Sequence, residues 1–132
     1  MKRHFLCAVV TAILFSVLPM GAQIRGFRQE QLKEWEFSKD GSSWETVAVP
    51  HSYNAEDGHS PYYYRGKATY RCDLRINDLK KNYYILFEGA AQAAVVMVNG
   101  EQVAAHKGGY TPFTVNITET LRKGVNRLEV VC

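Results

Sequence analysis

The sequence of 132 residues has little cysteine and no block of charge of one sign. Cys72 and Cys132 lie outside the N-terminal apolar run, and no CxxC or histidine-rich spacing accompanies them, so we expect neither a disulfide framework nor a metal site. Sixteen basic residues stand against 13 acidic ones without clustering, which argues against nucleic acid as a partner. The pair Gly108-Gly109 lacks phosphate-loop spacing, and no cofactor is expected.

The N-terminus has the three-part pattern of a secretory signal peptide. Lys2 and Arg3 precede an almost wholly apolar run over residues 5–18, and a helix break with small residues follows at 19–22. The run is shorter than the roughly 20 residues that span a membrane. We predict that residues 1–22 are cleaved off and that the protein is exported to the bacterial periplasm or the extracellular space, without membrane attachment. The alternative for the apolar run is a buried N-terminal helix.

Short alternating apolar runs, separated by turn residues, are typical of β-strands. In residues 67–76, Ala68, Tyr70 and Leu74 alternate with charged residues, which specifies one buried face. Similar runs predict strands over 35–37, 44–49, 83–87, 93–98, 102–106, 113–117 and 125–132. No long amphipathic helix is present, so the pattern predicts a two-sheet antiparallel β-sandwich, with jelly-roll and immunoglobulin-type topologies both open.

Several local features refine this prediction. Asn99-Gly100 between two apolar runs indicates a tight hairpin. Residues 118–124 are expected to form a helical turn capped by Thr118. The polar residues 23–31 lack periodicity and are expected to lie over the fold. Because the sequence stops inside an apolar strand, we expect the sandwich of residues 23–132 to be truncated at its C-terminal end.

Short segments along the chain resemble, in the same order, the N-terminal domain of family 2 glycoside hydrolases, the β-galactosidase and β-glucuronidase type. These segments are WETVAVPH (44–51), YRG (64–66), LFEG (86–89), VNG (98–100), GGYTPF (108–113) and LRKGVN (121–126). Ser52-Tyr53 stands where the family often has Asp-Trp, which bears on direct contact with a sugar.

The resemblance implies a jelly-roll, galactose-binding-like domain that precedes an immunoglobulin-like domain and a catalytic (β/α)8 barrel in the same protein. Such enzymes hydrolyse the O-glycosyl bonds of β-glycosides with retention, using two glutamates of the barrel about 5 Å apart. This chain has no barrel, so we assign it no catalytic residue. Its expected role is to shape the substrate pocket of the missing barrel.

Polar residues in the segment from 51 to 65 are the candidates for contact with carbohydrate. His51 follows a strand end, where it could face a sugar or satisfy local backbone groups. Asn54 and Asp57 carry groups that orient sugar hydroxyls, and they are equally common turn residues. Arg65 could pair with a carboxylate within the sandwich or across a domain boundary.

Two other functions fit the same pattern. A free-standing carbohydrate-binding module would need an exposed aromatic platform, for which residues 62–64, three tyrosines, are candidates. An adhesion or scaffold sandwich would need no sugar contact. The reading frame after Cys132 separates the enzyme from these alternatives, because only the enzyme needs a barrel.

Overall fold

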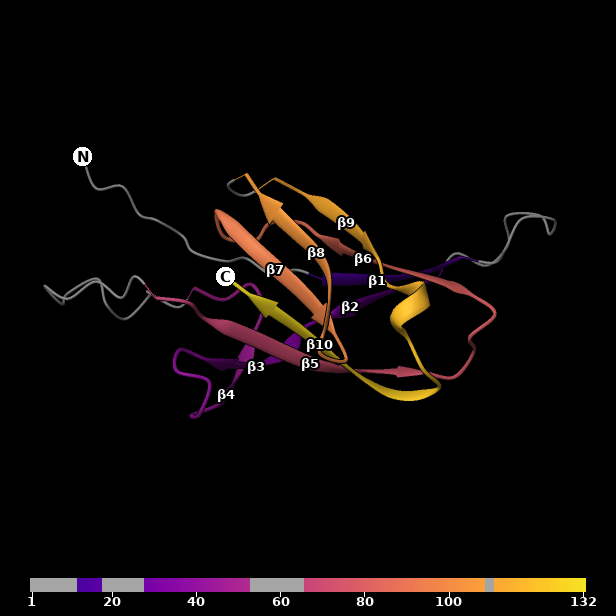
Figure 1. Cartoon of the computed structure of the whole chain (residues 1–132), viewed down its shortest axis with the longest axis horizontal. Helices are drawn as coiled ribbons and strands as arrows, with labels where there is room; N and C mark the ends of the chain where they lie inside the picture. The colour runs from indigo at the N-terminus through magenta and orange to yellow at the C-terminus, as the bar shows by residue number, and fades with distance from the viewer. Residues whose placement is uncertain (1–11, 18–27, 53–65, 109–110) are drawn as a thin grey trace, which may run out of the picture.

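The computed structural model of the protein describes residues 12–17, 28–52, 66–108 and 111–132 (Figure 1). These residues form ten strands and a short 3-10 helix, η2 (Thr118–Thr120). The strands are β1 (Ala12–Val17), β2 (Arg28–Leu32), β3 (Glu34–Ser38), β4 (Glu45–Ala48), β5 (Thr69–Ile76), β6 (Asn82–Phe87), β7 (Ala93–Val98), β8 (Glu101–Lys107), β9 (Phe113–Asn116) and β10 (Gly124–Val131).

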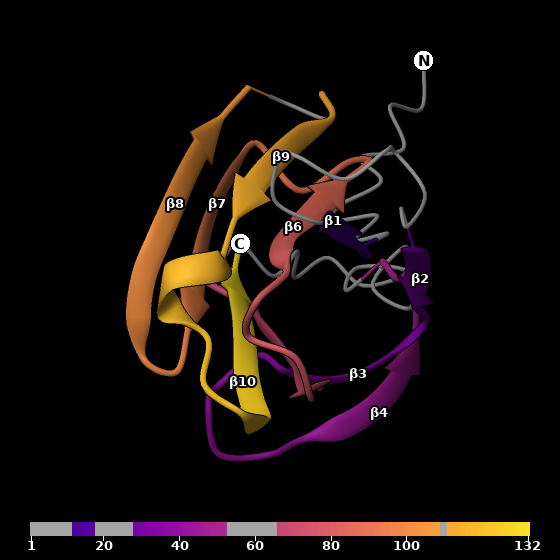
Figure 2. The same cartoon turned by 90° about the vertical axis from the view of Figure 1, so that its right-hand side faces the viewer.

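The strands form two antiparallel sheets that face each other. One has four strands in the order β2-β1-β6-β9, and the other has six in the order β4-β3-β5-β10-β7-β8. Figure 2 shows the six-stranded sheet curving around the four-stranded one. The arrangement confirms the predicted all-β sandwich.

The core lies between the sheets and follows the alternation of the sequence. Tyr70, Leu74 and Ile76 of β5 are at most 1% exposed, as the pattern of residues 67–76 predicts. The neighbouring strands contribute further large buried side chains: Trp35, Phe37, Ile85, Phe87, Val96, Val98, Leu128 and Val130. Each such burial contributes about 1.5–3 kcal/mol, so this shared interior is the main source of stability.

Cys72 packs against this core from β5 and carries a free thiol. Burial raises the pKa of the thiol to about 12, and the neighbouring Asp73 adds to the rise. The thiol therefore stays protonated at neutral pH, and Cys72 acts as a small apolar side chain at the edge of the core.

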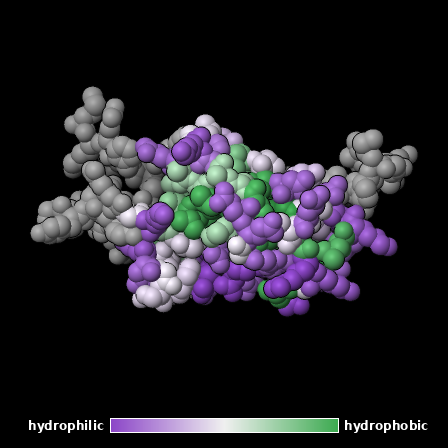
Figure 3. All heavy atoms as spheres, in the orientation of Figure 1, coloured by the Kyte–Doolittle hydropathy of each residue, from purple (hydrophilic) through white to green (hydrophobic). Residues whose placement is uncertain are grey.

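The outer face of the six-stranded sheet mixes apolar and charged side chains. The nearly continuous apolar run 93–98 is typical of a central strand covered on both faces, whereas Val95 and Met97 on the outer side of β7 are only half-buried. Figure 3 shows apolar atoms over β7 surrounded by polar ones. Beside them, Arg71 Nε donates to Glu36 Oε2 at 2.7 Å, and Arg127 Nε donates to Asp73 Oδ1 at 2.7 Å.

The segment expected to lie over the fold as a polar cover is partly a strand. Arg28–Leu32 forms β2 at the edge of the four-stranded sheet, and all of its residues except Leu32 are exposed. An edge strand needs only main-chain pairing on one side, so a polar sequence without alternation does not exclude it. The prediction was wrong because it used side-chain burial alone.

The prediction that Thr118 caps the helical turn was also wrong. Thr118 begins η2, which has no side-chain cap. Its hydroxyl instead accepts the N–H of Tyr83 at 2.9 Å and donates to the Tyr83 carbonyl at 3.3 Å. The threonine side chain thus pairs with the main chain of β6 and does not accept a hydrogen bond from an N–H group of the helical turn.

The apolar run near the N-terminus contains a strand, not the buried helix considered as an alternative. β1 lies between β2 and β6 and is antiparallel to both, with Ala12 opposite Leu32 and Phe87. This structure belongs to the chain with its first 22 residues present. Removal of these residues on export remains a prediction.

Two hydrogen-bonded asparagines, Asn99 and the buried Asn126, join the turn between β7 and β8 to the segment between η2 and β10. Asn99 begins the predicted hairpin turn with φ 52°, and Gly100 follows with φ 81°, as both turn positions require. Asn99 Nδ2 donates to Asn126 Oδ1 at 2.8 Å and to the Thr120 carbonyl at 3.1 Å. Asn126 is 0% exposed; its Oδ1 also accepts the Arg122 N–H, and its Nδ2 donates to the Arg122 carbonyl at 2.8 Å.

We expect Asn126→Ala to destabilise the protein by about 2–4 kcal/mol, because it leaves several buried donors and acceptors without partners. Urea unfolding measures the change. Asn116→Ala is the control, since Asn116 is exposed and its side chain accepts only the Thr118 N–H, at 3.1 Å. Equal losses in the two variants would contradict the role given to the buried amide.

Candidate functional site

His51 is the one predicted sugar-contact residue that lies within the described part of the chain. The Val49 N–H donates to the Lys33 carbonyl at 2.9 Å, which continues the pairing of β3 with the chain beyond β4. His51 then places Nδ1 3.0 Å from the hydroxyl of Tyr70, a core residue of β5. Its ring centroid lies 4.8 Å from that of Phe37. The imidazole is therefore anchored on the end of the core.

The surroundings of His51 favour its neutral form. Burial lowers the pKa of the imidazole, nearby Lys39 lowers it further, and Glu45 opposes the shift. A neutral ring has one acceptor nitrogen and one donor nitrogen, so it can accept a hydrogen bond from the Tyr70 hydroxyl and donate one elsewhere. Of the two alternatives for His51, contact with a sugar or a bond to a group of the same domain, the Tyr70 hydroxyl supplies the second.

A hollow of about 310 Å³ lies beside this cluster, at the turn between β3 and β4. It is lined by Phe37, Ser38, Lys39, Asp40, Ser43, Trp44 and Glu45. The Arg71 guanidinium lies 3.6 Å from the centroid of the Trp44 ring and fixes it against the sheet. An indole next to polar side chains is a suitable wall for a hydroxylated ligand.

Asp40 in this hollow builds the turn. Its Oδ1 accepts the N–H groups of Ser42 and Ser43, both at 2.8 Å, and the hydroxyl of Ser38 at 3.0 Å. These hydrogen bonds hold the pKa of the carboxyl well below its usual range, because they favour the charged form. We therefore assign Asp40 a structural role.

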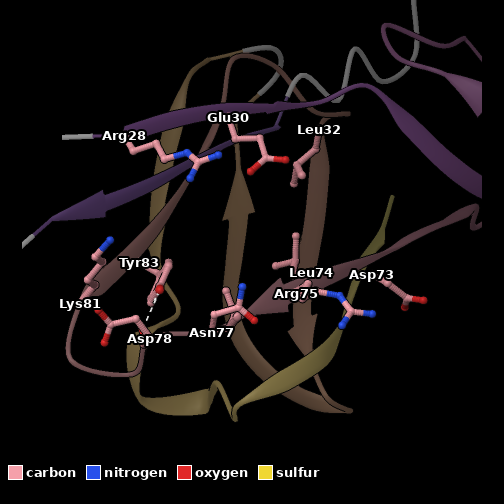
Figure 4. Close-up of a pocket in the computed structure, with 11 residues that line it drawn as sticks. Arg28, Glu30, Leu32, Asp73, Leu74, Arg75, Asn77, Asp78, Lys81 and Tyr83 are labelled. Carbon is pink, nitrogen blue, oxygen red and sulfur yellow. Dashed lines mark hydrogen bonds between the residues drawn. The ribbon is translucent and has the colours of Figure 1, made fainter. Parts of the chain in front are cut away.

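A second hollow, of about 400 Å³, opens between β2 and the end of β5 (Figure 4). Arg28, Glu30 and Leu32 extend from β2 on one side, and Asp78 and Tyr83 lie opposite. Tyr83 donates its hydroxyl to the Asp78 carbonyl at 2.6 Å. Sequence reasoning missed this hollow because one of its walls is the strand that it took for a polar cover.

A stack of three rings joins the two sheets at the opposite edge. The His106 ring of β8 lies 4.1 Å from Phe113 of β9 at 11°, and Phe113 lies 4.8 Å from Phe87 of β6 at 18°. His106 Nε2 is 3.0 Å from Thr111 Oγ1. Phe113 therefore packs against the core through Phe87.

The other candidate residues lie outside the described part of the chain: they are Asn54, Asp57 and Arg65, and the three tyrosines at 62–64. Sequence reasoning also missed the tyrosine partner of His51. It placed Tyr70 on the buried face of a strand, but the contact joins residues 19 apart in the chain and depends on where the chain beyond β4 lies relative to β5.

No group of three or more His, Cys, Asp or Glu side chains in the described part of the chain is arranged to hold a metal ion. None of the helices in that part is long and apolar enough to cross a membrane.

Comparison with known proteins places these features in a family. The profile of the glycosyl hydrolase 2 galactose-binding domain-like family matches residues 46–132. A β-galactosidase of Thermoanaerobacter pseudethanolicus is 40% identical over 68% of the chain, and one of Thermoanaerobacterium thermosulfurigenes is 35% identical over 80%. The crystal structure of a Bacteroides uniformis β-glucuronidase superposes with a TM-score of 0.68 at 30% identity, over 75% of the chain.

The chain is much shorter than these relatives. It spans 13% and 16% of the two β-galactosidases and 14% of the β-glucuronidase chain. The match nevertheless runs from within β4 to the end of β10, and it includes the hydrogen-bonded pair Asn99 and Asn126 and the ring stack. The chain belongs to the galactose-binding-like domain family of the family 2 glycoside hydrolases.

Proposed function

We propose that this chain is the N-terminal, non-catalytic domain of an exported family 2 β-glycosidase, in which it shapes the rim of a substrate pocket formed by a downstream barrel. The observation that carries the proposal is the family match over residues 46–132 in a chain that spans about one-seventh of its relatives. The relatives named above are β-galactosidases and a β-glucuronidase, so a β-glycoside is the substrate class.

The polar groups described above support a non-catalytic role. The carboxylate of Asp40 binds its own turn, that of Glu36 binds Arg71, and that of Asp73 binds Arg127. A retaining glycosidase needs two carboxyl groups about 5 Å apart, one of them protonated near neutral pH. Side chains already committed to turns and ion pairs do not meet that need.

The loops at the His51 end are the part best suited to touch a substrate. A rigid sandwich can hold loop residues with precision, and recognition residues concentrate on such loops. His51 is anchored on Tyr70 and leads directly into residues 53–65, which hold Asn54, Asp57 and Arg65. We infer that this segment forms the edge that faces the barrel.

The proposal predicts that the complete protein hydrolyses an aryl β-galactoside or aryl β-glucuronide, while the 132-residue chain alone does not. Release of the aryl group measures both activities. Failure of the complete protein on every β-glycoside offered would contradict the enzyme and favour the free-standing binding module. Turnover by the short chain, lost when one carboxylate is neutralised, would contradict the non-catalytic role.

A substitution at His51 tests the position of the pocket rim. In the complete enzyme we expect His51→Ala to raise KM about three- to tenfold with a smaller change in kcat, because it disturbs contacts made equally in the ground and transition states. Tyr70→Phe is the matched variant, since it removes the hydroxyl partner and keeps the ring.

An intermediate rise in KM for Tyr70→Phe would fit anchoring of His51 by the tyrosine. Unchanged KM in His51→Ala, together with lower thermal stability, would instead assign the histidine to the packing of the sandwich alone.

A further inference from the structure

The turn dipeptide Asn99-Gly100 is chemically reactive as well as structural. The main-chain nitrogen that follows an asparagine can attack the side-chain carbonyl carbon, Cγ, and close a five-membered succinimide ring with loss of ammonia. Glycine is the residue that obstructs this attack least, because it has no side chain. Gly100 is exposed, and no atom of the described residues lies within 4 Å of the place that a Cβ would take there. The attacking nitrogen is therefore open to solvent.

The structure holds the Asn99 side chain through both of its amide protons and its carbonyl oxygen. Nδ2 donates to the Thr120 carbonyl at 3.1 Å and to Asn126 Oδ1 at 2.8 Å, and Oδ1 accepts the Arg127 N–H at 3.0 Å. The main-chain N–H of Asn99 also donates to the Arg127 carbonyl, at 2.8 Å. These bonds tie the turn between β7 and β8 to η2 and β10 (Figure 1).

Closure of the succinimide ring needs an amide that is free to rotate. Cγ of Asn99 must turn about the Cα–Cβ and Cβ–Cγ bonds until the Gly100 nitrogen lies over one face of the carbonyl group. While the amide is bonded to η2 and β10, this rotation breaks hydrogen bonds that stabilise the fold. The reaction therefore has to wait for a local opening of the native structure.

We propose that Asn99-Gly100 is a deamidation site, which the native hydrogen bonds keep closed and which any opening of the β7–β8 turn away from β10 exposes. In the open state, hydroxide removes the proton of the Gly100 nitrogen, and this nitrogen attacks Asn99 Cγ. The Cγ–Nδ2 bond breaks, and Nδ2 leaves as ammonia with a proton from water. Water then opens the succinimide at either carbonyl and leaves aspartate or isoaspartate at position 99. Water is the only co-reactant.

The product does not fit the network, because the Asn126 amide cannot turn round to receive it. Asn126 Oδ1 accepts the Arg122 N–H at 2.9 Å, and its Nδ2 donates to the carbonyls of Arg122 and Gly124 at 2.8 and 3.2 Å. These main-chain partners decide that the oxygen of Asn126 faces position 99. A carboxylate there presents an acceptor to this oxygen and to the Thr120 carbonyl, where the amide presents two donors.

Deamidation thus turns a passing opening into a lasting loss. The main chain is not the obstacle, since aspartate adopts a φ of 52° about as readily as asparagine does. The obstacle is the carboxylate, which meets the oxygen of an asparagine that is 0% exposed and gains no donor there. Isoaspartate also adds a carbon to the main chain between Val98 and Glu101, which end β7 and begin β8. Each modified copy loses the connection between the hairpin turn and β10.

The first test compares Asn99 in the folded and in the unfolded complete protein. Both samples stand in mildly alkaline buffer, one of them with denaturing guanidinium chloride, and trypsin then releases the peptide 82–107. Asn82 in the same peptide is an internal control, because the bulky Tyr83 follows it. We expect Asn99 to convert at least about tenfold more slowly in the folded sample. Mass spectrometry of the peptide measures aspartate and isoaspartate at each position.

Equal rates in the two samples would overturn the protection of Asn99 by the fold. Aspartate without isoaspartate would contradict the succinimide, because the ring opens on both sides. Conversion of Asn82 at the rate of Asn99 in the unfolded sample would contradict the special role of Gly100.

Two variants separate the hydrogen bonds from the stability of the whole fold. Asn126→Ala removes one acceptor of the Asn99 amide, whereas Phe87→Leu weakens the core where the Phe87 ring stacks on Phe113. Each variant is incubated at the temperature that gives the same unfolded fraction. We expect Asn99 to convert about two- to tenfold faster in Asn126→Ala than in Phe87→Leu, because only the first frees the amide without global unfolding. Equal rates would assign the protection to the whole fold and overturn the role of the network.

A second pair of variants tests the effect of the product. Asn99→Asp and Asn116→Asp add the same charge, but Asn116 Oδ1 only accepts the Thr118 N–H, at 3.1 Å, which a carboxylate also does. We expect Asn99→Asp to lower the urea midpoint of unfolding and Asn116→Asp to leave it nearly unchanged. Equal shifts would contradict the clash of acceptors at position 99. None of these outcomes depends on whether the protein hydrolyses a glycoside.

Discussion

The central constraint on this sandwich is that the main chain of β6 must be paired on both sides while its side chains fill the core. β9 supplies one partner and β1 the other. Ile85 and Phe87 of β6 are 0% exposed, so the strand cannot move outward to find water for its N–H and C=O groups. Whatever lies beside β6 must therefore be a strand. β2 is in turn held in the sheet by β1, and the hollow is lined by side chains of β2, so both depend on the strand beside β6.

The family resemblance is carried largely by residues that build turns and fasten loops. Asn99 and Gly100 adopt positive φ in the hairpin, Gly124 has φ 99° at the start of β10, and Asn126 is buried in the network that joins them. Such positions accept few residue types, because a β-branched or large side chain is strained at positive φ and an apolar one cannot satisfy the loop. The VNG and LRKGVN segments thus identify the fold for a physical reason, whereas they contain no group of the hydrolytic reaction.

The sequence predicted the parts of the fold that are decided by local alternation. β5 is the clearest case, because shifting Tyr70 and Leu74 by one position would bury charged neighbours. β2 was missed, since an edge strand with an exposed polar face has no alternation to detect. The assignment of Thr118 as a cap was wrong because its hydroxyl found a partner 35 residues away on β6.

The candidate site shows the same limit. The position of His51 at a strand end was visible in the sequence, but its contact with Tyr70 depends on where the chain beyond β4 lies relative to β5. That contact also constrains what the loop can do. An imidazole kept neutral and held on one nitrogen has a fixed orientation, so the chain that follows it starts from a fixed point. A side chain held in one orientation loses little entropy when another domain or a ligand contacts it, so the anchored imidazole suits a surface that is shaped before binding.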